Sequence, residues 1–205
     1  LPSGLSIDGS AANDILGTSI GGKTDLNRDG IDDLIIGAGG ASPFGNKNSG
    51  MAVVVFGRKN WTKTKKTATA TATATALDGS IDTADESNEG ITKIAGRREM
   101  DGCGVVVSGG GDVNHDGIQD VAIGCRGGYE PEALNGGTTV VIFGQPGTWP
   151  KTMKVSEIDG NNGFSMHGST KNEQGTTAMD IAGAMNGDGI EDVLIGANMW
   201  NSATG

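Results

Sequence analysis

The stretch DLNRDGIDDLIIGA, at residues 25–38, occurs three times in this sequence in closely related forms. It returns as DVNHDGIQDVAIGC at 112–125 and as AMNGDGIEDVLIGA at 184–197. Each copy is an acidic, glycine-containing loop that runs directly into an apolar, β-branched segment, which is typical of a turn followed by a buried strand. The repetition predicts a β architecture that is built around the same loop in each unit.

Two further elements recur in register with the loop. VVVFG at 53–57 returns as VVIFG at 140–144, and a glycine-bounded segment precedes each loop: GLSIDG (4–9), GITKIAG (90–96) and GFSMHG (163–168). Each unit therefore predicts a set of short antiparallel strands, and we find no persuasive apolar period of a helix. Units of four such strands are typical of propeller blades.

The predicted fold is all-β, with propeller-type blades of four-stranded antiparallel sheets in a single repeat array over residues 1–205. The first repeat covers about 1–80, the second about 81–158, and a partial third about 159–205. The third unit stops at NSATG, where its VVxFG strand is expected, which leaves an open strand edge. Either the chain is cut from a longer propeller, or a neighbouring subunit completes the sheet with a strand of its own.

The composition restricts the partners of the chain. The formal net charge is −10, and the only basic cluster, RKNWTKTKK at 58–66, is short, which argues against extended nucleic-acid binding. No apolar run approaches the length needed to span a membrane. Because the acidic residues concentrate in the repeated loops, cations are the expected partners.

The loops carry hard oxygen donors at alternate positions around a glycine turn, which is the pattern that Ca²⁺ requires. Metal-free turns use the same residue types, but two complete copies in register favour a metal. Ala184 replaces the first carboxylate of the third loop, so we expect a weaker third site. The predicted ligands, with the isoleucines acting through their carbonyls, are Asp25, Asn27, Asp29, Ile31 and Asp33, then Asp112, Asn114, Asp116, Ile118 and Asp120, and in the third loop Asn186, Asp188, Ile190 and Asp192.

The DxNxDGxxDLxxGA loop and strand, followed by VVxFG, resembles the FG-GAP repeat of the integrin α-chain β-propeller and similar secreted proteins. The resemblance covers nearly the whole chain. It implies that the loop residues named above bind Ca²⁺ between two strands of a blade in a structural role. It also implies adhesion, matrix or ligand recognition, although some members carry attached enzymes, so that the fold does not fix the function.

Cys103 and Cys125 flank the second loop. If Val107 pairs with Val121 in the hairpin, the two cysteines lie directly opposite each other, at a separation that a disulfide can bridge. A disulfide is favoured over two free thiols, and it indicates an oxidising compartment.

Three remaining signals are local. Asn60 opens the N-glycosylation sequon Asn-Trp-Thr, so glycans are predicted there. GTSIGGKT at 17–24 matches a phosphate-binding loop, but a metal loop and a strand follow it where a helix is required. His115 and His167 are the only histidines, and neither has a nucleophilic partner in the sequence pattern, so no catalytic residue is predicted.

The sequence therefore predicts a non-catalytic, extracellular or cell-surface, calcium-stabilised module. It would act in adhesion or as a structural subunit of a larger assembly, including a filament. The predicted partners are other protein chains, chiefly further copies joined by strand complementation. The alternative is an accessory domain of a secreted hydrolase such as a phospholipase.

Overall fold

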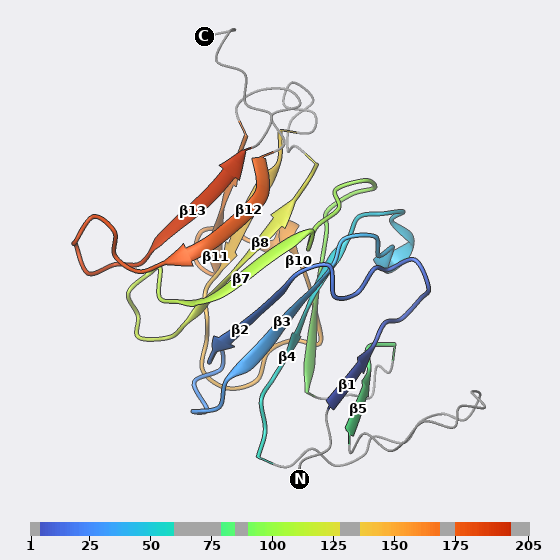
Figure 1. Cartoon of the computed structure of the whole chain (residues 1–205), viewed down its shortest axis with the longest axis horizontal. Helices are drawn as coiled ribbons and strands as arrows, with labels where there is room; N and C mark the ends of the chain where they lie inside the picture. The colour runs from blue at the N-terminus through green and yellow to red at the C-terminus, as the bar shows by residue number, and fades with distance from the viewer. Residues whose placement is uncertain (1–4, 60–78, 85–89, 128–135, 169–174, 198–205) are drawn as a thin grey trace, which may run out of the picture.

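The computed structural model describes residues 5–59, 79–84, 90–127, 136–168 and 175–197. Over these residues the regular structure consists of β-strands and two short 3₁₀ turns, at Pro43–Gly45 and Val155–Glu157 (Figure 1). The all-β fold of propeller-type blades is therefore confirmed. Within the same ranges, no helix has the length and apolar character needed to cross a membrane.

The first blade is a four-stranded antiparallel sheet with a fifth strand added at its outer edge. Its strands, in spatial order, are β2 (Ile20–Thr24), β3 (Asp33–Ala38), β4 (Met51–Val55) and β6 (Ile91–Ala95). The short strand β10 (Thr152–Lys154) pairs in parallel with β6. All five residues of β4 are buried, because the sheet is covered on both faces.

The second blade repeats this arrangement with β7 (Val106–Gly111), β8 (Asp120–Cys125), β9 (Thr138–Ile142) and β11 (Gly163–His167). A third unit is present as the antiparallel hairpin of β12 (Gly175–Ala182) and β13 (Asp192–Ala197). The outer strands β6 and β11 come from the glycine-bounded segments that open the next sequence repeat. Each blade is thus offset by one strand from the repeat read along the sequence.

A parallel ribbon of β1 (Leu5–Asp8) and β5 (Gly79–Asp82) lies beside the first blade (Figure 1). In chain order β1 is the counterpart of β6, and β5 is the counterpart of β10. The ribbon therefore reproduces the parallel pair that β6 and β10 form at the edge of the first blade.

The layers pack through side chains that alternate between the two faces of each strand. Ile35 of β3 belongs to an apolar cluster shared with Val107 and Val121 of the second blade. Its neighbour Ile36 faces the other way and joins Ile81 of the ribbon. A third cluster joins the second blade to Ile181 of the hairpin, so apolar side chains fill all three interfaces.

The register of the second hairpin differs from the sequence prediction. Val107 pairs with Ile123 instead of Val121, and Val121 pairs with Gly109. The strands pair up to the loop itself, with a bulge in the glycine run just after Gly109. Because the offset is two residues, each side chain keeps its predicted face.

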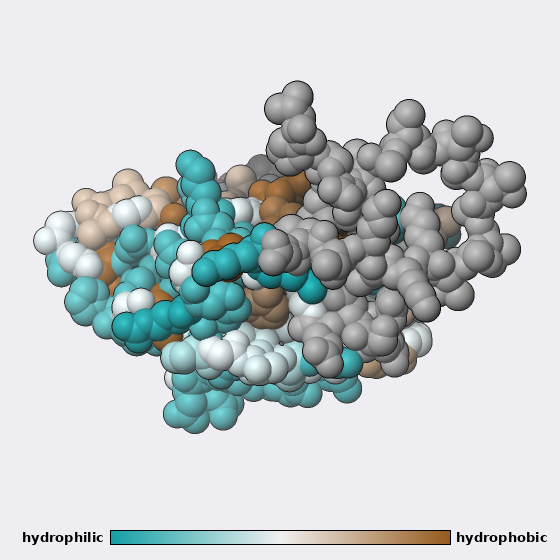
Figure 2. All heavy atoms as spheres, turned by 90° about the horizontal axis from the view of Figure 1, so that it is seen from below, coloured by the Kyte–Doolittle hydropathy of each residue, from teal (hydrophilic) through white to brown (hydrophobic). Residues whose placement is uncertain are grey.

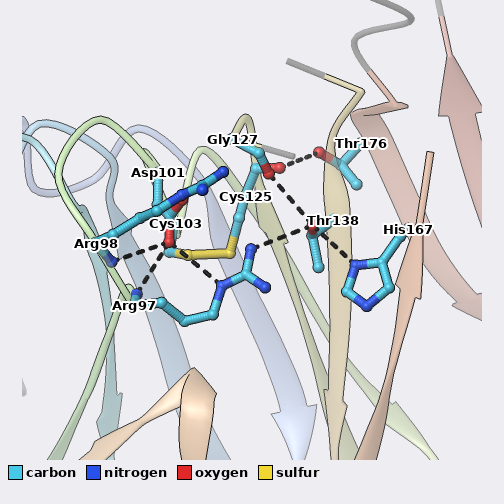
Figure 3. Close-up of a disulfide and its surroundings, with 9 residues drawn as sticks. All are labelled: Arg97, Arg98, Asp101, Cys103, Cys125, Gly127, Thr138, His167 and Thr176. Atoms are coloured by element: carbon cyan, nitrogen blue, oxygen red, sulfur yellow. Dashed lines mark hydrogen bonds and ion pairs between the residues drawn. A yellow bond between two sulfur atoms is a disulfide. The ribbon is translucent and has the colours of Figure 1, made fainter. Parts of the chain in front are cut away.

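Cys103 and Cys125 are joined by a disulfide, although the register is not the one from which we inferred it (Figure 3). Cys103 precedes β7, and the chain turns between them at Gly104, whose φ is +84°. Beside the disulfide, Asp101 is fully buried and forms ion pairs with Arg97 and Arg98, at 3.4 and 3.1 Å. The disulfide fastens the segment before β7 to the end of β8, and the ion pairs hold that segment in its own turn.

Candidate metal-binding loops

Each acidic loop connects the first two strands of its unit, and the three loops project from the same end of the sheets (Figure 1). Two residues in each loop have the left-handed backbone that closes a tight turn. At the sixth loop position this residue is a glycine, which adopts a positive φ without steric cost. The φ values at the fourth and sixth positions are +58° and +82° for Arg28 and Gly30, +58° and +82° for His115 and Gly117, and +78° and +84° for Gly187 and Gly189.

The first loop folds its side-chain oxygens over its own backbone. Asp25 accepts hydrogen bonds from the N–H groups of Asp29 and Gly30, at 3.0 and 2.8 Å. Asn27 accepts a second bond from the Asp29 N–H at 3.1 Å, and Asp29 accepts one from the Ile31 N–H at 2.9 Å. The oxygens of the first and third positions therefore converge on a single N–H group.

The second loop forms the same four bonds. Asp112 accepts from Asp116 and Gly117 at 3.0 and 2.7 Å, Asn114 accepts from Asp116 at 3.1 Å, and Asp116 accepts from Ile118 at 2.8 Å. The two loops thus share one conformation, as their sequences predict.

The carboxylate at the ninth loop position is buried and ties together three parts of its blade. Asp33 accepts hydrogen bonds from Leu26, at the start of the loop, and from Gly57, which follows β4, at 2.9 and 2.8 Å. Asp120 accepts from Val113 and Gly144 at 2.7 and 2.8 Å. Sequence reasoning missed the glycine donors, although their fixed place in VVxFG was a signal that could have identified them.

Burial has a clear electrostatic effect on these carboxylates. Desolvation raises the pKa of Asp33 to about 6, with smaller contributions from the charges of Asp29 and Asp25, and in spite of its two backbone hydrogen bonds. The pKa of Asp120 is raised to about 6 for the same reasons. At neutral pH the first and second loops therefore each hold an ionised carboxylate that its surroundings disfavour, and a bound cation would relieve this cost.

The third loop lacks the first carboxylate but keeps the rest of the pattern. Asn186 accepts from the Asp188 N–H at 2.9 Å, and Asp188 accepts from the Ile190 N–H at 2.8 Å. Asp192 accepts from the Met185 N–H through Oδ2 at 2.8 Å, whereas its Oδ1 accepts no bond from the residues that the structure describes. No glycine counterpart of Gly57 reaches this oxygen within those residues.

The loops of successive units are also connected to each other. The Asp25 N–H donates to the Gln119 side chain of the second loop at 2.6 Å. The Asp112 N–H donates to the Glu191 side chain of the third loop at 3.2 Å. The residue at the eighth position thus reaches back to the loop of the preceding unit.

The donor set suits a hard divalent cation, since it mixes carboxylate, amide and main-chain carbonyl oxygens. Within the described ranges, however, no group of three or more His, Cys, Asp or Glu side chains is arranged to hold a metal ion. Calcium binding by these loops stays a prediction. The glycosylation prediction at Asn60 lies outside the described residues.

The close approach of Gly144 to the second loop predicts a specific loss of stability. A Cβ atom at this position would lie 2.2 Å from the carbonyl oxygen of Gln119. We expect Gly144→Ala to reduce the free energy of unfolding by about 2 kcal/mol or more in urea titrations. Gly183→Ala is the matched control, because a Cβ there meets no atom within 4 Å. Equal losses in the two variants would contradict the steric role of Gly144.

The raised pKa values of Asp33 and Asp120 predict a pH dependence of stability in the calcium-free protein. The folded state binds these protons more tightly than the unfolded chain, so their contribution to stability is complete below about pH 4 and is lost as the pH rises through about 6. The loss is at most about 3 kcal/mol for each group. Urea titrations in EDTA across this range measure it.

The double variant Asp33→Asn, Asp120→Asn should flatten this pH dependence, although each asparagine also loses one acceptor oxygen. Asp159→Asn is the control, since a hydrogen bond from Asn161 lowers the pKa of that exposed carboxyl. An unchanged slope in the double variant would rule out the two buried carboxylates as its origin.

Comparison with known proteins agrees with this geometry. Residues 17–55, which contain the first loop with its two following strands, match the FG-GAP repeat family. Integrin alpha-2 of Mus musculus is 30% identical over 111 residues, which is 54% of this chain and 8% of that protein. The chain thus spans less than a tenth of the length of this curated relative. Residues 17–55 therefore contain an FG-GAP repeat, and the chain is similar to an integrin α chain over about half of its own length.

Proposed function

We propose that this chain is a non-catalytic, extracellular or cell-surface module of the integrin-like type, stabilised by Ca²⁺ and acting in adhesion or in a larger protein assembly. The observation that carries the proposal is the shared hydrogen-bond pattern of the first two loops around buried carboxylates. The similarity to an integrin α chain supports the adhesive role, and the disulfide supports an oxidising compartment.

Calcium would be held in the first two loops by Asp25, Asn27, Asp29, Asp33 and the Ile31 carbonyl, and by their counterparts in the second loop. Its chemistry there is electrostatic, because the cation offsets the mutual repulsion of the carboxylates and the cost of ionising the buried one. The third loop, with Ala184 in place of the first carboxylate, would bind more weakly.

The described residues do not favour an enzyme. His115 occupies the left-handed fourth position of the second loop, where the backbone is committed to the turn. His167 lies on β11, and its Nδ1 is 3.2 Å from the hydroxyl of Thr138 (Figure 3). The same Thr138 hydroxyl also lies 3.2 Å from the Gly127 carbonyl, so this contact belongs to the hydrogen bonds at the end of the sheet.

Association with other chains would use the edge of β13. Leu194 and Ile195 are 46% and 39% exposed, whereas their counterparts in the first blade, Ile35 and Ile36, are buried against β4 and the adjoining layers. Asp192 offers the Oδ1 that in both complete blades accepts the glycine N–H after the third strand. A VVxFG strand from another chain fits this edge by β-augmentation, with its glycine donating to Asp192.

Calcium binding predicts a rise in thermal stability. Ca²⁺ added to the EDTA-treated protein should stabilise it by about 2.7 kcal/mol when the free ion is at a hundred times its Kd. We expect Asp25→Asn with Asp112→Asn to remove most of the effect, while Asp159→Asn leaves it intact. Ala184→Asp should increase the response. Differential scanning calorimetry at constant ionic strength measures these shifts, and identical melting with Ca²⁺ and EDTA would refute the calcium role.

Among the residues that the structure describes, β13 pairs only with β12, and its other edge predicts the strand that it would accept. A labelled peptide with the sequence of residues 138–145, TTVVIFGQ, should bind the chain, and fluorescence anisotropy measures its affinity. Replacing its glycine with alanine should weaken binding at least tenfold, since in the second blade a Cβ at this glycine would overlap a loop carbonyl. Equal affinity of the two peptides would contradict docking in the register of β9.

A further inference from the structure

A pocket of about 490 Å³ lies between the first two blades, at the end of the sheets opposite the acidic loops. It is formed by the segment before β2, the connection from β3 to β4, and the segment before β7. Its main lining side chains are Asn13, Ile15, Asn48, Met100, Val105 and Arg126. The volume is within the range of about 300–1,000 Å³ that is usual for ligand sites.

Two apolar side chains at this pocket are unusually exposed. Ile15 is 63% and Met100 66% exposed. Both residues have a left-handed backbone, with φ of +54° and +64°, which is rare for a β-branched residue such as isoleucine. An exposed apolar side chain and a strained backbone both fail to stabilise the fold. Their combination is therefore more typical of a binding site than of inert surface. By contrast, the coloured part of the face in Figure 2 is mostly hydrophilic, with apolar residues in separate patches.

The pocket is fixed in shape by bonds between its walls. The Met100 N–H donates to the Lys47 carbonyl at 2.9 Å, and the Gly102 N–H donates to the Asn48 carbonyl at 3.1 Å. The Asn48 amide also contacts the Met100 sulfur at 3.5 Å. The disulfide joins the residues next to Gly102 and Arg126, which are both in the lining. A ligand would therefore meet a pre-organised site.

Arg126 gives the pocket a positive charge. Its side chain is exposed, and no carboxylate of the described residues lies within ion-pair distance of it. Asp14 is buried and accepts a main-chain hydrogen bond, and Asp101 is buried in its two ion pairs. Glu99 is the exposed acidic residue next to Met100, and it is not part of the lining.

We infer that this pocket binds an acidic segment of a partner protein. A Glu or Asp carboxylate of the partner pairs with the Arg126 guanidinium, whose planar donors match a carboxylate. A neighbouring aliphatic side chain packs on Ile15 and Met100, and the amides of Asn13 and Asn48 bond the partner's backbone. The inference names a partner chemistry for the adhesive role proposed above, and rests on that role for the choice of a protein ligand.

The test is an NMR titration of the ¹⁵N-labelled chain, in Ca²⁺, with the peptide acetyl-Ile-Glu-Ile-Gly-amide. Shifts should concentrate in residues 12–18, 39–48 and 100–105, and Arg126→Gln should weaken binding at least fivefold. Arg28→Gln is the matched control, because it removes an exposed arginine from the opposite end of the first blade. The same peptide with glutamine in place of glutamate should bind at least fivefold more weakly.

A second variant separates binding from folding. Ile15→Asn suits the left-handed backbone better than isoleucine, so the variant should melt at or above the wild-type temperature while it binds the peptide more weakly. The inference is overturned if the glutamine peptide binds equally well, if Arg126→Gln and Arg28→Gln behave alike, or if inorganic phosphate produces the same shifts and displaces the peptide. If calcium still stabilises the protein, any of these results would refute peptide binding at the pocket without affecting the proposed function.

Discussion

A buried carboxylate that accepts two main-chain N–H groups is the interaction on which each complete blade depends. Asp33 and Asp120 each connect the start of the acidic loop to the glycine that follows the third strand. Loop, second strand and third strand are therefore fixed by one side chain. Its burial makes ionisation unfavourable, and the clustered carboxylates of the same loop add to that cost. The group that organises the blade is thus also one whose ionisation a bound cation would favour.

The features that were predictable from the sequence are those with local signals. Glycine turns, β-branched runs and the spacing of DxNxDGxxD specify the loop and the strand that follows it, and both complete loops adopt one conformation. The parallel pairs were not predictable, because β10 has only three residues and no apolar pattern, and its pairing with β6 is tertiary. The hairpin register was missed because glycines around Gly109 have no side chains to distinguish one alignment from another.

The residues of the candidate sites also divide into those that local sequence predicts and those that only tertiary packing brings together. Residues within one loop were found as a set, since their spacing carries the chemistry. Gly57 and Gly144 were overlooked as donors because every residue type but proline has a backbone N–H, so that only their fixed place in VVxFG pointed to this role. Arg126 and Ile15 are far apart in sequence, and only the packing of the first two blades brings them to one pocket. The links from Gln119 and Glu191 to the preceding loops likewise depend on how the blades stack.

The offset of one strand between blade and sequence repeat has a consequence for how such a chain can change in length. A tandem duplication of one repeat would supply the closing strand of the blade before it and the first three strands of a new one. The new blade would in turn be closed by the repeat that follows. The array could therefore gain or lose whole units without leaving an unpaired strand at the junction, and neighbouring blades would be interlocked through the chain itself.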